Sequence, residues 1–139
     1  MTIHAEELVV DTRGGGDMHD VTAWVESVVA SAKVRDGIVV VSVVGSTAGV
    51  TTIEYEPGLA SDLSRSLDRV APADVQYEHD KRWGDGNGHS HIRASLLGPS
   101  LTLAVMSGKP VLGTWQQVVL VDFDTRERTR RVVVQVMGE

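Results

Sequence analysis

Residues 38–44, with the sequence Ile-Val-Val-Val-Ser-Val-Val, constrain the fold of this chain more than any other segment. The segment is short, and nearly all of its side chains are apolar and β-branched, which favours an extended conformation. A strand without alternation of polar and apolar residues is typical of a sheet that is covered on both faces. We therefore predict a central, doubly covered β-strand at this position.

Other segments also have the composition and length of β-strands. They are residues 3–10, 50–56, 101–106, 116–123 and 129–136. Apolar residues at helical spacing predict one helix over residues 21–36 and a second over residues 59–70. A short helix is expected over residues 91–97, with Ser90 as its N-cap.

This combination of many strands with two main helices and one short helix shows no regular βαβ alternation. It favours the α+β class, with a mixed, largely antiparallel sheet or sandwich. The length of 139 residues is ordinary for one domain, and no internal repeat is present. Residues 1–139 are therefore expected to form a single domain.

Composition narrows the classes of function. The net charge is −6, whereas a general nucleic-acid binder normally has a basic surface. No apolar run approaches the length of a membrane span, and the polar N-terminus does not resemble a signal peptide. We therefore expect a cytoplasmic protein with no nucleic-acid partner and no membrane attachment. The chain has no cysteine, which leaves histidine and carboxylate side chains as possible metal ligands.

Residues 77–99 hold the densest group of chemically versatile side chains. His79, His89 and His91 lie there, with Asn87 as a candidate substrate ligand and several glycines that allow tight folding. In an extended segment His89 and His91 point to the same side, and His79 can approach from the other end of the loop. Three histidines around an open coordination position are typical of a catalytic metal site. We predict a divalent ion, Mg²⁺ or Zn²⁺, at these histidines; the alternative is a polar surface loop.

Two carboxylates are candidates for acid–base chemistry. Glu54 follows a Ser-Thr turn on a predicted strand, where it is a general base, a Mg²⁺ ligand or a solvated residue. Asp62 projects beside the apolar stripe of its predicted helix. It is an active-site acid only if that helix lines the cleft, and otherwise it is a surface carboxylate.

Two turns contain candidate substrate-binding groups. Ser46 and Thr47 can offer hydroxyl and N–H groups to a phosphate, although short turns of this kind are common. Trp115 and Gln116, which follow Thr114, combine an aromatic face with an amide that can recognise a heterocycle; core packing of Trp115 is the alternative. A basic cluster at the last hairpin is either a solvated turn or a contact for an anion or a neighbouring subunit: Arg126, Arg128, Arg130 and Arg131.

Four ordered motifs of the chain resemble the YjbQ family (UPF0047). They are Gly-Ser-Thr-Ala-Gly-Val-Thr-Thr-Ile-Glu at residues 45–54, Tyr-Glu-His-Asp at 77–80, His-Ile-Arg-Ala-Ser-Leu-Leu-Gly-Pro-Ser at 91–100 and Leu-Gly-Thr-Trp-Gln at 112–116. The likeness continues through residues 130–134 to the C-terminus. The resemblance implies a compact α+β domain that assembles as a homotrimer, with a polar cleft lined by His, Glu and Asp.

Some members of this family are described as secondary thiamine-phosphate synthases. The resemblance therefore implies a transferase that joins a pyrimidine pyrophosphate to a thiazole phosphate and releases pyrophosphate. It assigns Glu54, Asp62 and His79 to catalysis and matches His91 to a family histidine. The alternatives are a metal-assisted hydrolase or transferase of another small phosphorylated metabolite, and a non-catalytic ligand-binding trimer.

Two positions depart from the family pattern. Gly45 stands where the family usually has a histidine, and Ile53 stands where it has an asparagine. His89, in turn, stands where many members lack a histidine. We predict that His89 supplies the missing imidazole, so that the metal ligands are His79, His89 and His91.

Overall fold

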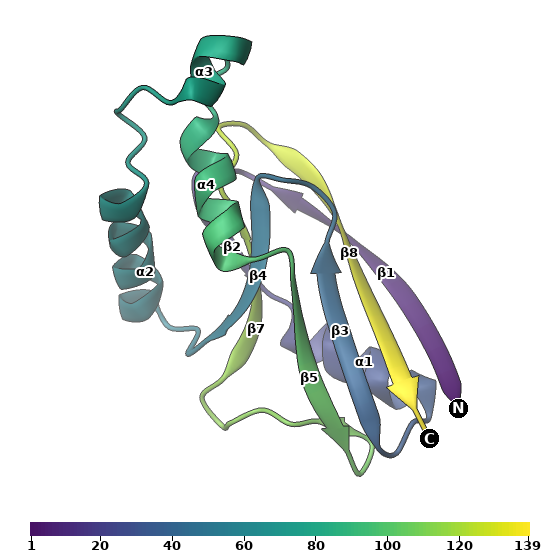
Figure 1. The fold of residues 1–139 in the computed structure, drawn as a ribbon. Helices are drawn as coiled ribbons and strands as arrows, with labels where there is room; N and C mark the ends of the chain where they lie inside the picture. The colour runs from purple at the N-terminus through teal and green to yellow at the C-terminus, as the bar shows by residue number, and fades with distance from the viewer.

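Two antiparallel sheets organise the chain, which a computed structural model describes from Met1 to Glu139 (Figure 1). Every strand pairing is antiparallel, and the α+β class of the single domain is confirmed. In chain order the elements are β1 (Thr2–Thr12), β2 (Asp17–Asp20), α1 (Thr22–Ala32), β3 (Gly37–Val43), β4 (Ala48–Ile53), α2 (Pro57–Val70), α3 (Glu78–Trp83), α4 (Gly88–Leu97), β5 (Ser100–Met106), β6 (Lys109–Pro110), β7 (Gln117–Asp122) and β8 (Arg128–Gly138).

The apolar strand β3 lies in the middle of a five-stranded sheet with the order β1–β8–β3–β5–β6. Its side chains alternate in burial: Val39 and Val41 are fully buried, whereas Ile38 is 42% exposed. The predicted central strand is confirmed, but the prediction that both of its faces are covered is wrong for the single chain. Both faces of β3 are apolar, so composition does not distinguish the covered face from the uncovered one.

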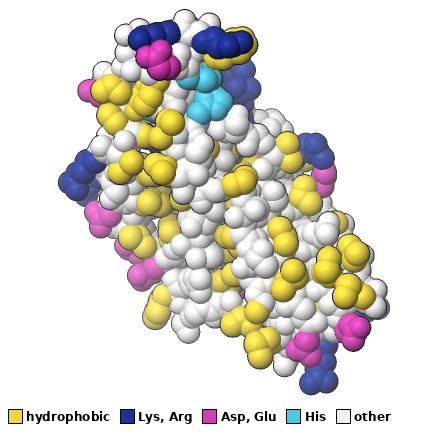
Figure 2. All heavy atoms as spheres, viewed as in Figure 1, with side chains coloured by type: hydrophobic (Ala, Val, Ile, Leu, Met, Phe, Trp, Pro, Cys, Tyr) yellow, Lys and Arg dark blue, Asp and Glu magenta, His cyan; other side chains and the backbone are white.

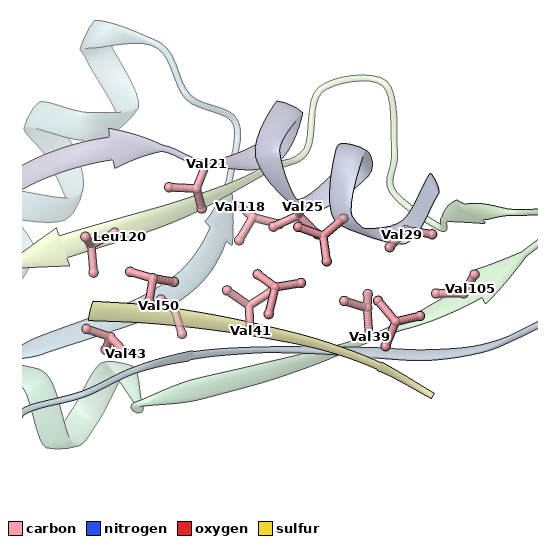
Figure 3. Close-up of a cluster of buried hydrophobic side chains, with 14 of the residues drawn as sticks. Val21, Val25, Val29, Val39, Val41, Val43, Val50, Val105, Val118 and Leu120 are labelled. Atoms are coloured by element: carbon pink, nitrogen blue, oxygen red, sulfur yellow. The ribbon is translucent and has the colours of Figure 1, made fainter. Parts of the chain in front are cut away.

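The strand that is covered on both faces is β7, in the middle of the three-stranded sheet β2–β7–β4. Val118 and Leu120 pack into the main core with α1 and the five-stranded sheet (Figure 3). Val119 and Val121 pack on the opposite face, beneath α2 and α4. All four side chains are fully buried. β7 therefore links the two cores and ends, at Asp122, just before Phe123, whose carbonyl oxygen contacts Ser90 of α4.

Several element boundaries differ from the predictions because local contacts set them. α4 begins at Gly88 rather than at residue 91, and Ser90 does not cap it, because its Oγ donates to the Phe123 carbonyl oxygen (2.6 Å). α1 ends at Ala32, where Lys33 takes a left-handed conformation with φ 54°. The sequence pattern does not predict β2 or α3, since elements of 4 and 6 residues are too short to show a period.

The outer face of the five-stranded sheet is uncovered and carries exposed apolar side chains beside the exposed Glu7–Arg131 ion pair. Ile3 and Val9 on β1 are 63% and 61% exposed, and Val44 beyond the end of β3 is 48% exposed. Figure 2 shows several apolar side chains on this face. An exposed apolar face of this kind is a typical contact surface for another protein chain. No helix of the protein is both long enough and apolar enough to cross a membrane.

Candidate functional site

Asp80 joins the N-termini of α3 and α4. Its Oδ2 accepts a hydrogen bond from the Tyr77 N–H (3.4 Å), and its Oδ1 accepts one from the Gly88 N–H (2.8 Å). A Cβ at Gly88 would lie 2.5 Å from the Tyr77 Cβ, so only glycine permits this approach of the two helices. The junction places His79 of α3 against His91 of α4.

The imidazole rings of His79 and His91 face each other, with centroids 4.3 Å apart and planes inclined at 41°. The Nδ1 atom of His79 lies 3.4 Å from Asp85 Oδ1 and 3.9 Å from Asp80 Oδ1. One ligand atom from each of these three residues lies within 4.8 Å of the others. A mixed nitrogen and oxygen set of this kind suits a divalent cation. Figure 2 shows histidine side chains at the same end of the molecule as α3.

His89 lies on the first turn of α4 rather than in an extended segment. Residues two apart on a helix point in different directions, so the expectation that spacing alone aligns His89 with His91 is wrong. His89 is 9% exposed, and its Nδ1 has no hydrogen-bond partner. Burial lowers the pKa of His89 and the neighbouring Arg93 guanidinium lowers it further, against the opposing charges of Asp80 and Asp68. His89 is therefore a buried imidazole with a free Nδ1, close enough to Asp80 for the two charges to interact.

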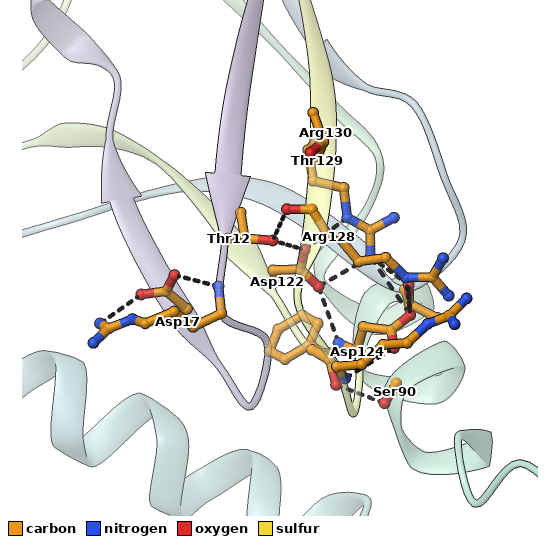
Figure 4. Close-up of polar contacts among 12 residues, drawn as sticks. Thr12, Asp17, Ser90, Asp122, Asp124, Arg128, Thr129 and Arg130 are labelled. Atoms are coloured by element: carbon orange, nitrogen blue, oxygen red, sulfur yellow. Dashed lines mark hydrogen bonds and ion pairs between the residues drawn. The ribbon is translucent and has the colours of Figure 1, made fainter.

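A buried ion pair lies directly beneath this end of the molecule (Figure 4). The guanidinium of Arg130 donates from Nε and Nη2 to the two carboxylate oxygens of Asp122, at 2.7 and 2.9 Å. The Thr12 hydroxyl donates to the same carboxylate. The Asp122 side chain is completely buried and that of Arg130 is 8% exposed. The expectation that Arg130 belongs to a solvated turn is therefore wrong.

Asp124 connects this ion pair to α4. Its Oδ2 accepts hydrogen bonds from the Thr47 hydroxyl (2.9 Å), the Asn87 amide (3.2 Å) and the Arg128 Nε (3.0 Å). Because Asn87 is the N-cap residue of α4, this hydrogen bond ties Asp124 to the start of the histidine-bearing helix. The hydroxyl of Thr47 also accepts a hydrogen bond from Arg130, so this predicted phosphate ligand already has two protein partners.

These contacts predict that the protein loses stability in acid through Asp124. Burial opposes ionisation of Asp124, but hydrogen bonds from Thr47, Asn87 and Arg128 lower its pKa from 3.8 to about 2. A carboxylate whose pKa is lower in the folded state than in the unfolded state contributes its full stabilisation above the unfolded-state pKa. That contribution is lost as the pH falls through the folded-state pKa. The loss should be about 2 kcal/mol in urea unfolding measured from pH 6 down to pH 2. An Asp124→Asn variant with an equally steep loss below pH 4 would contradict the assignment.

Asp122 and Asp124 lie next to the candidate site but were not among the residues predicted from the sequence. A sequence pattern could have identified them, because both carboxylates occur in the Val-Asp-Phe-Asp run that continues an otherwise apolar strand. A charged residue inside such a strand is buried only when it is paired. Arg130 lies eight positions after Asp122, across the β7–β8 connection, and is the partner.

Ser46 is exposed on the turn before β4, at the near end of the three-stranded sheet, whereas four other predicted site residues lie at its opposite end. Ala48 pairs with Asp122 at one end of the β4–β7 ladder, and Ile53 pairs with Gln117 at the other. Five steps of an antiparallel strand separate the two ends by about 17 Å. The exposed or half-buried residues at this far end are Glu54, Thr114, Trp115 and Gln116.

Two of these far-end residues have clear environments. Trp115 is 74% exposed, so core packing of this side chain is excluded. Gln116 donates from Nε2 to the Thr52 hydroxyl (3.0 Å) and accepts from the Gly113 N–H (3.0 Å). Asp62 is an exposed residue of α2, 3.5 Å from Arg65. One copy of the chain therefore does not bring Glu54 or Asp62 to the histidines.

Together these features define a class: an α+β protein of two antiparallel sheets, with a cluster of imidazoles and carboxylates at one end, on two short helices and the connection between them. Residues 6–139 match the family model described as "UPF0047 protein YjbQ-like". The chain belongs to this YjbQ-like family, UPF0047, a family of unknown function.

Relatives and solved structures agree with this assignment. A UPF0047 protein of Archaeoglobus fulgidus is 37% identical over 131 residues, which cover 94% of this chain and 99% of the relative. A crystal structure of a YbjQ-like protein of unknown function from Sulfolobus solfataricus P2 has a TM-score of 0.93 at 30% identity, covering 99% of this chain and 98% of that one. A YjbQ/UPF0047 structure from Clostridium acetobutylicum has a TM-score of 0.86 at 35% identity, covering 95% of this chain and 99% of that one.

Proposed function

We propose that the α3–α4 junction holds a divalent metal ion, Mg²⁺ or Zn²⁺, and acts on a small phosphorylated metabolite. The observation that supports this most directly is the convergence of ligand atoms from His79, Asp80 and Asp85. The Nδ1 atoms of His79 and His89 are buried without hydrogen-bond partners, and a ligand atom of this kind gains a partner when an ion binds. His91, whose ring lies against His79, is the further imidazole of the proposed ligand set.

The specific reaction that we propose, from the family resemblance, is of the thiamine-phosphate synthase type. A bound divalent ion would offset the negative charge of the departing pyrophosphate. The exposed Ser46 would donate a hydrogen bond to a phosphate, and Trp115 would stack on a heterocyclic ring. Any proton transfer that accompanies the reaction would be carried out by Glu54 or His79, since both side chains are at least partly exposed to solvent.

We further propose that the protein works as a homotrimer in which neighbouring copies complete each other's site. The length of β4 supports this, because about 17 Å of strand lies between Ala48, at the histidine end, and Ile53, which precedes Glu54 at the Trp115 end. In a cyclic trimer the histidine end of each copy can meet Glu54 and Trp115 of the next. The uncovered apolar face of the five-stranded sheet offers the surface for such contacts.

Metal titration and pyrophosphate release test this function together. The wild-type protein should bind one divalent ion per chain in calorimetry and release pyrophosphate from the two thiamine precursors only with that ion. His79→Ala should weaken metal binding by about tenfold or more, since it removes a direct ligand. His4→Ala is the matched control, because His4 lies on β1 and pairs with the neighbouring carboxylate of Glu6.

Two other results would each exclude one part of the proposal. Unchanged metal affinity and stoichiometry in His89→Ala would exclude His89 as the replacement imidazole. No pyrophosphate release with Mg²⁺, Mn²⁺ or Zn²⁺ would exclude the synthase reaction. In that case, turnover of another phosphorylated metabolite would identify a hydrolase or transferase, while ligand-dependent thermal stabilisation without turnover would identify a binding protein.

A further inference from the structure

An exposed tryptophan lies next to the histidine cluster. Trp83, the last residue of α3, is 64% exposed. It follows His79 by four residues, and residues four apart lie on one face of a helix, separated by one pitch of about 5.4 Å. The Gly84 N–H donates to the Asp80 carbonyl oxygen (2.7 Å), so the helical geometry continues through Trp83. The indole therefore lies one turn from His79, on the same side of α3.

A cation–π contact holds this indole. The guanidinium carbon of Arg82 lies 5.2 Å from the centroid of the Trp83 ring. A single cation covers one face of an aromatic ring, and the side chain of Trp83 stays largely exposed in spite of the contact. The other face of the indole is therefore open to solvent. The contact also keeps a positive charge beside the ring, which suits a ligand that carries negative charge.

The surroundings of Trp83 favour a small planar ligand over a protein partner. Trp83 is the only exposed large apolar residue between residues 78 and 86. The other exposed residues of this segment are charged residues and glycines. Figure 2 shows basic, hydrophobic and histidine side chains close together at this end of the molecule. A protein-binding surface normally has a contiguous apolar patch, whereas an aromatic side chain among basic ones is typical of a surface on which charged ring compounds stack.

We propose that Trp83 stacks on the aromatic ring of a metabolite whose phosphate group lies at the metal ion. The substrate class is thus a phosphorylated aromatic heterocycle. The position of the phosphate rests on the proposed function, whereas the position of Trp83 beside His79 does not. The ring would be held by the same copy of the chain that binds the ion. In a reaction that joins two heterocycles, Trp83 would hold one ring and Trp115 of the neighbouring copy the other.

Binding of phosphates with and without an aromatic base tests this role of Trp83. The probes are AMP and CMP, which carry a purine and a pyrimidine, and ribose 5-phosphate, which has no base. In calorimetry with saturating Mg²⁺ or Zn²⁺, the wild-type protein should bind both nucleotides about fivefold or more tighter than ribose 5-phosphate, because stacking tolerates either base. Trp83→Ala should lose this preference and keep its affinity for ribose 5-phosphate. Trp83→Phe should retain part of the preference.

Two other variants serve as comparisons. Leu96→Ala is the matched control, because it removes another exposed apolar side chain, 59% exposed, from α4. It should keep the wild-type preference for the nucleotides. Trp115→Ala removes the exposed tryptophan of the far end. Loss of the preference in Trp115→Ala but not in Trp83→Ala would place the ring on Trp115 and overturn the proposal.

The probes also separate this proposal from that of the metal site. Equal affinity of the wild-type protein for all three phosphates would overturn the role of Trp83 and leave the metal site standing. Absence of binding by all three phosphates, with either ion, would overturn both proposals. A changed oligomeric state of Trp83→Ala in size-exclusion chromatography, with an unchanged preference for the nucleotides, would assign Trp83 to a subunit contact instead.

Discussion

Replacing Asp122 with alanine is expected to lower the free energy of unfolding by about 3–5 kcal/mol. The variant leaves the Arg130 guanidinium charged and buried without the carboxylate that accepts two of its hydrogen bonds. It also removes the acceptor of the Thr12 hydroxyl and of the Asp124 N–H. Urea unfolding followed by circular dichroism measures the change. The effect should be much larger than that of an ordinary surface substitution.

The matched control for this prediction is Asp62→Ala. Asp62 is also a carboxylate near an arginine, but its side chain is 69% exposed and the pair is separated by 3.5 Å. Exposed ion pairs contribute little because water competes for both partners. If the two variants lose similar stability, the buried ion pair does not support the fold in the way inferred here.

Mixing two inactive variants, Glu54→Ala and His79→Ala, is expected to restore pyrophosphate release. In a cyclic trimer with shared sites, a site is intact when its histidines come from a Glu54→Ala copy and its glutamate comes from a neighbouring His79→Ala copy. Random mixing in equal amounts leaves roughly one quarter of the sites intact. The measurement is pyrophosphate release after the two proteins are unfolded together and refolded, with each variant alone as the baseline.

A second mixture provides the control for subunit exchange. His79 and His91 lie at the same end of the same copy, with ring centroids 4.3 Å apart. A mixture of His79→Ala and His91→Ala therefore contains no intact histidine end and should stay inactive. Absence of restored activity in the first mixture, with mixed trimers present by native mass spectrometry, would show that each copy holds a complete site.

The spacing of apolar residues along the chain predicted the strands and helices that are long enough to show a repeat. The apolar run at β3 and the leucine repeat of α2 predict their elements because several turns or alternations are present. β2 and α3 were not predictable in this way, since each is held by contacts from distant residues. β2 is held by its ladder to β7, and α3 is held to α4 by the hydrogen bond between Asp80 and Gly88.

The candidate site was predictable in part. The dense histidines at residues 77–99 identified His79 and His91, whose tilted rings the structure places in contact. Their carboxylate neighbours, Asp80 and Asp85, become candidate ligands only when α3 and α4 meet at the Asp80–Gly88 contact. Glu54 and Trp115 belong to the other end of the sheet in one copy, which no spacing along the chain could reveal.

Periodicity and short motifs, both of which are local in the chain, were enough to predict the fold class, the central apolar strand and the family. The packing of distant elements was needed to show that β7, and not β3, is the apolar strand covered on both faces. It also decided that Arg130 is buried against Asp122 with one nitrogen beside Gly45. Burial and charge pairing depend on which distant residues meet in the fold. The pattern of polar and apolar residues along one strand does not specify what packs against either face of that strand.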